Sequence, residues 1–285
     1  MDPLPGAEVD MLRALRTSYA NGLKDFAASS SSLRVVRTIP HQSAPSTPQI
    51  KSLYVLDASF NPPTKAHHRI ASTALLDDPA SEPKGLLILL ATQNADKNNK
   101  PASMENRLTM MTLFAHELLF DLHKQGHSPL VQVGIVKHPY FHDKAAAIDE
   151  SDQFPGPPQQ VHLLGFDTLI RLFNAKYYPS DKKLKVLEPF LSRHRLRVSY
   201  RPDSDWGSSS DQQKYVQDIA DGKRASEGAQ SGWASQISLV DGRKQDDKAI
   251  SSTLARAAAE KGPAELDQYV MPTIRDWIVS ENLYQ

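Results

Sequence analysis

Short apolar runs alternate with longer segments of helical period through most of this chain, and this alternation constrains the fold more than any other sequence feature. Parallel strands need a crossover of a dozen or more residues between them, usually a helix. Strand and helix signals in alternation therefore predict βαβ units and a parallel sheet. The runs that predict strands are Leu53–Asp57, Leu86–Thr92, Leu130–Val136, Val161–Leu164, Leu196–Tyr200 and Ile237–Val240, and the segments that predict helices between them are 64–77, 103–124 and 167–178.

These elements predict a doubly wound, Rossmann-like α/β fold, with a mostly parallel sheet and helices on both faces. Sheets of this kind bind ligands beyond the carboxyl ends of their strands, where the strand order reverses. We therefore expect the binding site of this chain in the loops that follow the strands.

The chain of 285 residues is long enough for one large α/β domain, which we place at 51–285. Residues 1–50 predict an N-terminal helix and then an extended arm, because the second half of this segment is rich in Ser and Pro. Segments near 139–160, with several Pro, and 202–235, rich in Ser, Asp, Gly and Gln, predict irregular surface insertions.

The charge balance and the cysteine content exclude several classes of protein. Lys plus Arg and Asp plus Glu each number 33, so no chain-wide field favours a nucleic acid or a membrane surface as partner. The chain has no Cys, which excludes disulfides, thiolate nucleophiles and sulfur-based metal sites. The longest apolar run, 85–91, is too short to cross a bilayer. We expect a protein of the cytoplasm or the nucleus. The sequence does not decide between a monomer and a homo-oligomer.

The segment from Ser59 to His67, which reads Ser-Phe-Asn-Pro-Pro-Thr-Lys-Ala-His, follows the first predicted strand. Pro62 and its neighbour Pro63 cannot continue a strand, so the chain must turn there. Thr64 is a natural N-cap, which places His67 in the first turn of the next helix, where unpaired backbone N–H groups attract anions. The alternative is a structural helix cap with His67 on the surface.

The segment from Ile250 to Arg256, which reads Ile-Ser-Ser-Thr-Leu-Ala-Arg, opens a late helix. Arg256 lies three residues after Thr253 and four after Ser252, so the three share one helix face. A guanidinium beside hydroxyls is suited to phosphate. The alternative is an ordinary capped helix with a solvated Arg.

Together these segments resemble two signatures of one enzyme family. Ser59 to His67 matches the T-x-x-H variant of the H-x-G-H nucleotidyltransferase signature, and Ile250 to Arg256 matches I-S-S-T-x-x-R. The combination resembles the nicotinamide (or nicotinate) mononucleotide adenylyltransferases, in a divergent fungal-type branch. Gly165-Phe166-Asp167 resembles the G-x-D element of that family, and Gln93 to Lys97 resembles its polar loop after the second strand.

The resemblance implies a reaction and a set of site residues. The reaction is adenylyl transfer from ATP to a pyridine mononucleotide, which forms NAD or deamido-NAD and pyrophosphate, with Mg²⁺ carried by the ATP phosphates and no metal ligands in the protein. The implied catalytic residues are His67 and Arg256, those for ATP and its phosphates are Ser59, Phe60, Thr64, Ser251, Ser252 and Thr253, and those for the mononucleotide are Asn61, Gly165, Asp167 and Lys97.

Two alternatives stay open at this point. Another adenylyl- or cytidylyltransferase of the same superfamily would share the phosphate residues and differ in its acceptor pocket. A regulatory protein that binds or hydrolyses ATP would also keep them. The family stacks an aromatic side chain on the pyridine ring, and the candidates here are Tyr177, Tyr178 and Trp206.

Overall fold

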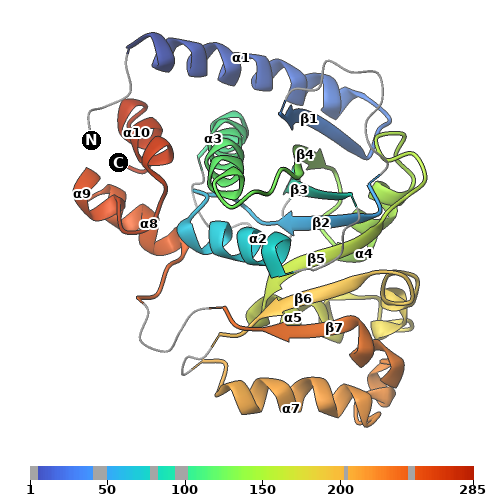
Figure 1. Cartoon of the computed structure of the whole chain (residues 1–285). Coiled ribbons are helices and arrows are strands. Elements are labelled where there is room, and N and C mark those ends of the chain that lie inside the picture. The colour runs from blue at the N-terminus through green and yellow to red at the C-terminus, as the bar shows by residue number, and fades with distance from the viewer. Residues whose placement is uncertain (1–5, 41–49, 78–82, 94–101, 202–204, 243–247) are drawn as a thin grey trace.

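A seven-stranded sheet forms the centre of the molecule, in the order β1-β4-β3-β2-β5-β6-β7 (Figure 1). The computed structural model describes residues 6–40, 50–77, 83–93, 102–201, 205–242 and 248–285. The strands are β1 (Leu33–Ile39), β2 (Ser52–Asp57), β3 (Lys84–Ala91), β4 (Leu130–Val136), β5 (Gln159–Gly165), β6 (Arg195–Ser199) and β7 (Ile237–Val240). Strands β2 to β7 pair in parallel, and β1 pairs antiparallel with β4.

The strand order reverses beside β2. The chain first moves outward from β2 to β3 and β4, then returns to place β5 on the other side of β2 and continues to β6 and β7. This order confirms the predicted doubly wound sheet and places its switch point at the carboxyl ends of β2 and β5.

Helices cover both faces of the sheet, which explains the uninterrupted apolar run of β3. Leu86, Ile88 and Leu90 pack on one face, and Leu87 and Leu89 pack on the other. The first face carries α1 (Gly6–Ala28), α2 (Lys65–Asp77), α3 (Met104–His123), α8 (Ser252–Ala259), α9 (Pro263–Leu266) and α10 (Pro272–Ser280), and the second carries α4 (Phe141–Asp149), α5 (Phe166–Leu172), α6 (Glu188–Leu191) and α7 (Ser209–Ala220). In the described part of the chain, no helix combines the length and the apolar character that a membrane crossing requires.

Residues 6–40, the part of the N-terminal segment that the structure describes, are more closely integrated than an arm. Residues 33–39, expected in an extended arm, are the edge strand β1 of the sheet. Helix α1 buries Leu12, Tyr19 and Phe26, which recur every seven residues and join the same core as α3. The Tyr19 hydroxyl and Thr112 Oγ1 of α3 lie 2.6 Å apart. The polar residues between the apolar positions of β1 hid this strand from the sequence pattern.

The two segments expected as irregular insertions contain helices. Helix α4, within 139–160, buries Ala145, Ala147 and Ile148 against the sheet. Helix α7, within 202–235, begins with a capping box formed by Ser208 and Asp211. Both helices carry few large apolar residues, so no apolar stripe marked them in the sequence.

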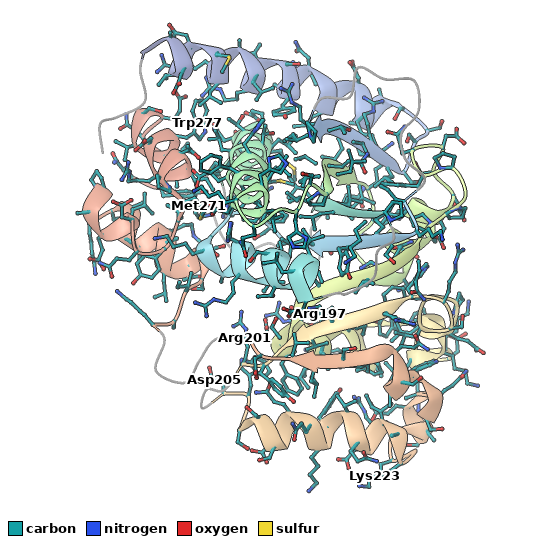
Figure 2. All side chains as sticks on the ribbon, in the orientation of Figure 1. Arg197, Arg201, Asp205, Lys223, Met271 and Trp277 are labelled. Carbon is teal, nitrogen blue, oxygen red and sulfur yellow. The ribbon has the colours of Figure 1, made fainter. Side chains whose placement is uncertain are left out.

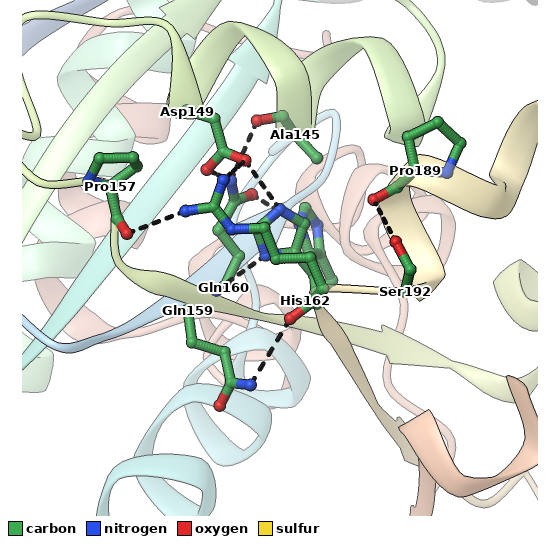
Figure 3. A network of polar contacts seen from close by, with 10 residues as sticks. Ala145, Asp149, Pro157, Gln159, Gln160, His162, Pro189 and Ser192 are labelled. Carbon is green, nitrogen blue, oxygen red and sulfur yellow. Dashed lines mark hydrogen bonds and ion pairs between the residues drawn. The ribbon is translucent and has the colours of Figure 1, made fainter.

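A polar network anchors α4 to the amino ends of β5 and β6 (Figure 3). The Asp149 carboxylate accepts hydrogen bonds from Arg193 Nη1 at 2.9 Å, His194 Nε2 at 3.0 Å and Gln160 Nε2 at 2.8 Å. Gln160 Oε1 lies 2.9 Å from Nε2 of the buried His162. This network holds the last turn of α4. The first turn of the same helix lies at the opposite edge of the sheet, near the carboxyl ends of the strands.

Candidate active site

A cavity of about 350 Å³ lies at the switch point of the sheet. Its walls come from the carboxyl ends of β2, β5 and β6, the first turns of α2, and the segment that leads into α8. Four of the predicted site residues line it together: His67, Gly165, Asp167 and Ser251.

His67 is held by the residue that precedes its helix. The backbone N–H of Thr64 donates to His67 Nδ1 at 3.0 Å, and Thr64 Oγ1 lies 2.9 Å from the same nitrogen. Because Nδ1 accepts, the neutral ring carries its proton on Nε2. Burial, reinforced by the charge of Arg201, lowers the pKa of His67 to about 4. His67 is therefore a neutral hydrogen-bond donor near pH 7 that keeps one fixed tautomer.

The two signature segments touch each other although they are far apart in sequence. Ser252 Oγ donates to the carbonyl oxygen of Pro62 at 2.8 Å, and Arg256 Nη1 donates to that of Asn61 at 2.8 Å. Arg256 Nη2 also donates to Thr253 Oγ1 at 3.3 Å. Arg256 thus lies against the turn after β2, although it is not among the residues that line the cavity.

The turn after β2 is also tied to the end of the chain and to α3. Asn61 Oδ1 accepts hydrogen bonds from the Tyr284 hydroxyl at 2.8 Å and from the N–H of Ala102 at 3.0 Å. Arg107 Nη1 donates to the carbonyl oxygen of Ser59 at 3.0 Å. The Asn61 side chain, predicted to bind the mononucleotide, is buried and already engaged within the protein.

The remaining predicted phosphate residues take different places. Phe60 is fully buried at a φ of 47°, in the left-handed region that is unusual for a non-glycine residue, and its ring packs on that of His67. Ser251 Oγ accepts from the Leu254 N–H at 3.2 Å as the N-cap of α8. Thr253 is exposed on the same helix. Lys97 lies outside the described residues.

Gly165 and Asp167 form one wall of the cavity with Arg201, a residue that the sequence did not single out. Asp167 Oδ1 lies 2.9 Å from Arg201 Nε. A Cβ at Gly165 would lie 2.6 Å from that carboxylate oxygen, so glycine leaves room for the Asp167–Arg201 pair. The buried Gln212 of α7 accepts from the N–H of Arg201 at 3.1 Å and donates to its carbonyl oxygen at 2.6 Å. Arg201 follows β6 at the same edge of the sheet (Figure 2), and this position directly after a strand could have identified it.

The charged lining of the cavity favours an anionic ligand. The cations that line it are Lys65, Arg69, Arg201 and Lys248, and the carboxylates are Asp57 and Asp167. Both carboxylates have a cationic partner, since Asp57 pairs with Lys144 and Asp167 pairs with Arg201. The excess of positive charge suits the phosphates of a nucleotide.

A smaller cavity of about 170 Å³ adjoins the first on the other side of β2. It is lined by Asp57, Ala58, Ser59, Ala91, Gln93, Pro139, Phe141, Lys144 and Thr168. Asp57, Ala58 and Thr168 line both cavities, so these three residues form a common wall.

The aromatic residues proposed to stack on a pyridine ring are dispersed. Tyr178 is half-buried, with its ring 6.2 Å from that of Tyr140 and 5.8 Å from that of His142. Tyr177 is also half-buried, and Trp206 packs against the core around β6. The aromatic residue that lines the smaller cavity is Phe141.

The carboxylates at the site do not form a cage for a resident metal. Within the described ranges, no group of three or more His, Asp or Glu residues could hold an ion. Because both cavity carboxylates already face a cation, a magnesium ion at this site would depend mainly on phosphate oxygens and water for its ligands.

Comparison with known proteins points to one enzyme family. No protein-family model matches the chain. It is 34% identical over 256 residues to a Schizosaccharomyces pombe protein provisionally named nicotinamide mononucleotide adenylyltransferase, across 89% of this chain and 91% of that protein.

Two solved structures share the fold. Both are of Plasmodium falciparum nicotinic acid mononucleotide adenylyltransferase, one in complex with APC and one with NaAD. The TM-scores are 0.50 and 0.52, at 16% and 14% sequence identity, with 82% of this chain and 97% of the other chain covered in each case. At such identities the likeness concerns the fold alone.

Proposed function

The chain belongs to the nicotinamide mononucleotide adenylyltransferase family, and we propose that its two adjoining cavities hold the two substrates of adenylyl transfer. ATP occupies the larger cavity, beside His67 and Ser251, and the pyridine mononucleotide occupies the smaller one. The observation that carries this proposal is the common wall of Asp57, Ala58 and Thr168, because the reacting phosphates must meet where the cavities join.

The reaction is a single in-line displacement. A 5′-phosphate oxygen of the mononucleotide attacks the α-phosphorus of ATP and forms the new P–O bond, while the bond from the α-phosphorus to the bridging oxygen of pyrophosphate breaks. The two mononucleotide units are then joined as a dinucleotide, and pyrophosphate leaves with the electron pair of the broken bond. Mg²⁺ enters as part of the ATP substrate and neutralises charge on the departing phosphates.

His67 and the α8 segment have separate roles in this scheme. His67 donates from Nε2 to an α-phosphate oxygen as negative charge builds there. Arg256, Ser252 and Thr253 hold the β- and γ-phosphates, and for this Arg256 exchanges part of its contact with the Asn61 carbonyl for phosphate oxygens. Backbone N–H groups around Ser59 and Phe60 complete the phosphate cradle.

The geometry supports one change to the residue roles that the family resemblance implied. Gly165 and Asp167 line the larger cavity with His67, so we place them beside the ribose of ATP, whose hydroxyls can donate to the Asp167 carboxylate. Lys97 and the backbone of Asn61 remain assigned to the mononucleotide.

A substrate panel tests the proposal. Purified protein is incubated with ATP and Mg²⁺ and one acceptor at a time, and dinucleotide and pyrophosphate are quantified. We expect dinucleotide with nicotinamide or nicotinate mononucleotide and none with the acceptors of coenzyme A, FAD or CDP-alcohol synthesis. Release of phosphate or AMP from ATP alone, without any dinucleotide, would instead support the ATP-hydrolysing alternative.

A further inference from the structure

The wall between the two cavities contains a buried ion pair. Lys144, in the second turn of α4, places its ammonium 2.5 Å from Oδ2 of Asp57, the last residue of β2. The side chains are only 6% and 7% exposed. Neither residue belongs to the T-x-x-H or I-S-S-T-x-x-R signatures, and α4 lies in a segment that the sequence predicted to be irregular.

Burial makes this pair energetically demanding. Removing two charges from water costs several kcal/mol for each ion, and the attraction between them often does no more than offset that cost. A pair of apolar residues of similar volume could stabilise the fold equally well. The pair therefore calls for a role beyond folding.

The Lys144 ammonium has N–H donors beyond the one that Asp57 accepts. An ammonium carries three N–H donors, and among the described residues its one hydrogen bond goes to Asp57. The ring of Phe141 lies 5.4 Å away and limits the directions open to the ammonium. Lys144 and Phe141 both line the smaller cavity, so the remaining donors lie beside its interior.

The position of the pair matches the path of the acceptor phosphate. A nucleophile that attacks ATP in the larger cavity from the smaller one must lie over the common wall, which includes Asp57. An unpaired Asp57 carboxylate would repel that phosphate, whereas the Lys144 ammonium attracts it. A cation fixed at this point both neutralises the wall and binds the phosphate.

We propose that Lys144 binds the 5′-phosphate of the mononucleotide and that Asp57 is the positioning residue that aims its ammonium. This inference rests on the proposed function, because it needs the acceptor in the smaller cavity. It adds to that function a residue that sets the affinity for the acceptor phosphate.

The first test is Lys144→Met, which keeps most of the length of the unbranched side chain and removes its charge. Losing a charge-assisted hydrogen bond of this kind costs roughly 10- to 100-fold in affinity. We expect the KM for the mononucleotide to rise by about that factor and the KM for ATP to change less than about threefold. Equal changes in both KM values would overturn the assignment.

A second variant separates phosphate binding from neutralisation of Asp57. Asp57→Asn/Lys144→Met removes both charges at nearly constant volume, so it remains informative even if Lys144→Met alone does not fold. We expect the double variant to keep a KM for the mononucleotide at least about tenfold above that of the unsubstituted protein. Recovery of the normal KM would mean that Lys144 only neutralises Asp57, and would overturn the proposal.

A third readout isolates the phosphate. The nucleoside that lacks the 5′-phosphate cannot react, but it can compete with the mononucleotide. Its inhibition constant should be the same in the Lys144→Met variant as in the unsubstituted protein, while the KM for the mononucleotide rises. An equal loss for nucleoside and nucleotide would mean a general distortion of the pocket and contradict a phosphate contact.

Lys137→Met is the matched control. Lys137 follows β4 a few residues before α4, donates to the carbonyl oxygen of Ser29 at 2.5 Å, and lines neither cavity. This variant should keep both KM values. If the unsubstituted protein forms no dinucleotide, the proposed function fails. If it does and Lys144→Met leaves the KM for the mononucleotide unchanged, this inference alone fails.

Discussion

His67 combines a fixed tautomer with a neutral ring, and this combination makes it a suitable donor to a phosphate. The acceptor role of Nδ1 follows from the Thr64 contacts, and the neutral state follows from a pKa of about 4. The charge of a bound triphosphate would stabilise the protonated ring and bring this pKa back toward the ordinary value. The donor at Nε2 is present in either state.

His67→Ala should lower kcat by roughly 10² to 10³, which is the typical loss when one preorganised transition-state donor is removed. The cavity wall would lose an imidazole but no buried charge, so the circular dichroism spectrum and the Tm should stay close to those of the unsubstituted protein. A folded His67→Ala variant with an unchanged kcat would remove this residue from the mechanism.

His162 should make stability depend on pH. Burial, with smaller contributions from His194 and Lys144, lowers the pKa of His162 from an ordinary value of about 6.5 to about 3. In the unfolded chain, His162 therefore binds a proton near pH 6.5, whereas in the folded protein it binds one only near pH 3. Stability that is fully present above pH 6.5 is lost as the pH falls toward 3, by up to about 1.4 kcal/mol per pH unit.

The measurement is urea denaturation between pH 6.5 and pH 4. His162→Phe keeps an aromatic ring beside Phe141 and Phe190 and should lose stability less steeply over this range. His127→Phe, at an exposed position, serves as the control and should keep the original slope. An unchanged slope in His162→Phe would show that other groups carry the acid sensitivity.

The turn after β2 is the element on which the site depends. Its carbonyl groups are held from one side by α3 and α8, and the Asn61 side chain is held by Tyr284. We expect the turn, held in this way, to present the backbone N–H groups of Ser59 and Phe60 to an anion. Tyr284 thus supports the turn that we propose as the phosphate cradle.

Tyr284→Phe tests this support. It removes only the hydroxyl that donates to Asn61 Oδ1, which keeps its second donor from Ala102, so we expect kcat/KM for ATP to fall about 3- to 10-fold. Tyr19→Phe is the matched control, because it also removes a hydrogen-bonded tyrosine hydroxyl, whose partner, Thr112, lies away from the turn. Both variants should lose similar stability. Equal kinetics in the two would contradict a positioning role for Tyr284.

The sequence predicted those elements well in which the apolar residues follow one regular spacing over the whole element. The strands β2 to β7 and the helices α2 and α3 match the predicted segments closely, because uninterrupted apolar runs and a strong helical stripe specify them. β1 and α4 were not predicted because their stability comes from neighbours, through pairing with β4 for β1 and through packing on the sheet for α4.

The same contrast applies to the residues of the site. His67 and Arg256 belong to signatures that can be read from sequence. Arg201 and Lys144 come close to the cavities through strand order and helix packing, so no local pattern marks them.

At the scale of the whole molecule, one sheet edge collects segments from most of the chain. The strand order places the ends of β2, β5 and β6 side by side, and α8 returns to the same edge (Figure 1). Helix α1 packs on α3 and reaches the last helix, where Arg16 pairs with Glu281 beyond α10 and its guanidinium lies 5.7 Å from the ring centroid of Trp277. Residues 6–40 therefore belong to the packed body of the protein.

Phe26→Ala tests whether that segment folds with the rest. Phe26 is 1% exposed, so its truncation should lower the free energy of unfolding by about 3 to 5 kcal/mol. A single core predicts one unfolding transition shifted to lower temperature in calorimetry, with kcat unchanged in the folded protein. A separate N-terminal unit would leave the main transition in place.

The fate of the α-phosphorus of ATP tests the central claim most directly. In a reaction with nicotinamide mononucleotide and ATP labelled at the α-phosphorus, the label should appear in the dinucleotide, and label at the γ-phosphorus should appear in pyrophosphate. Label recovered as AMP or free phosphate, with none in a dinucleotide, would contradict adenylyl transfer at this site.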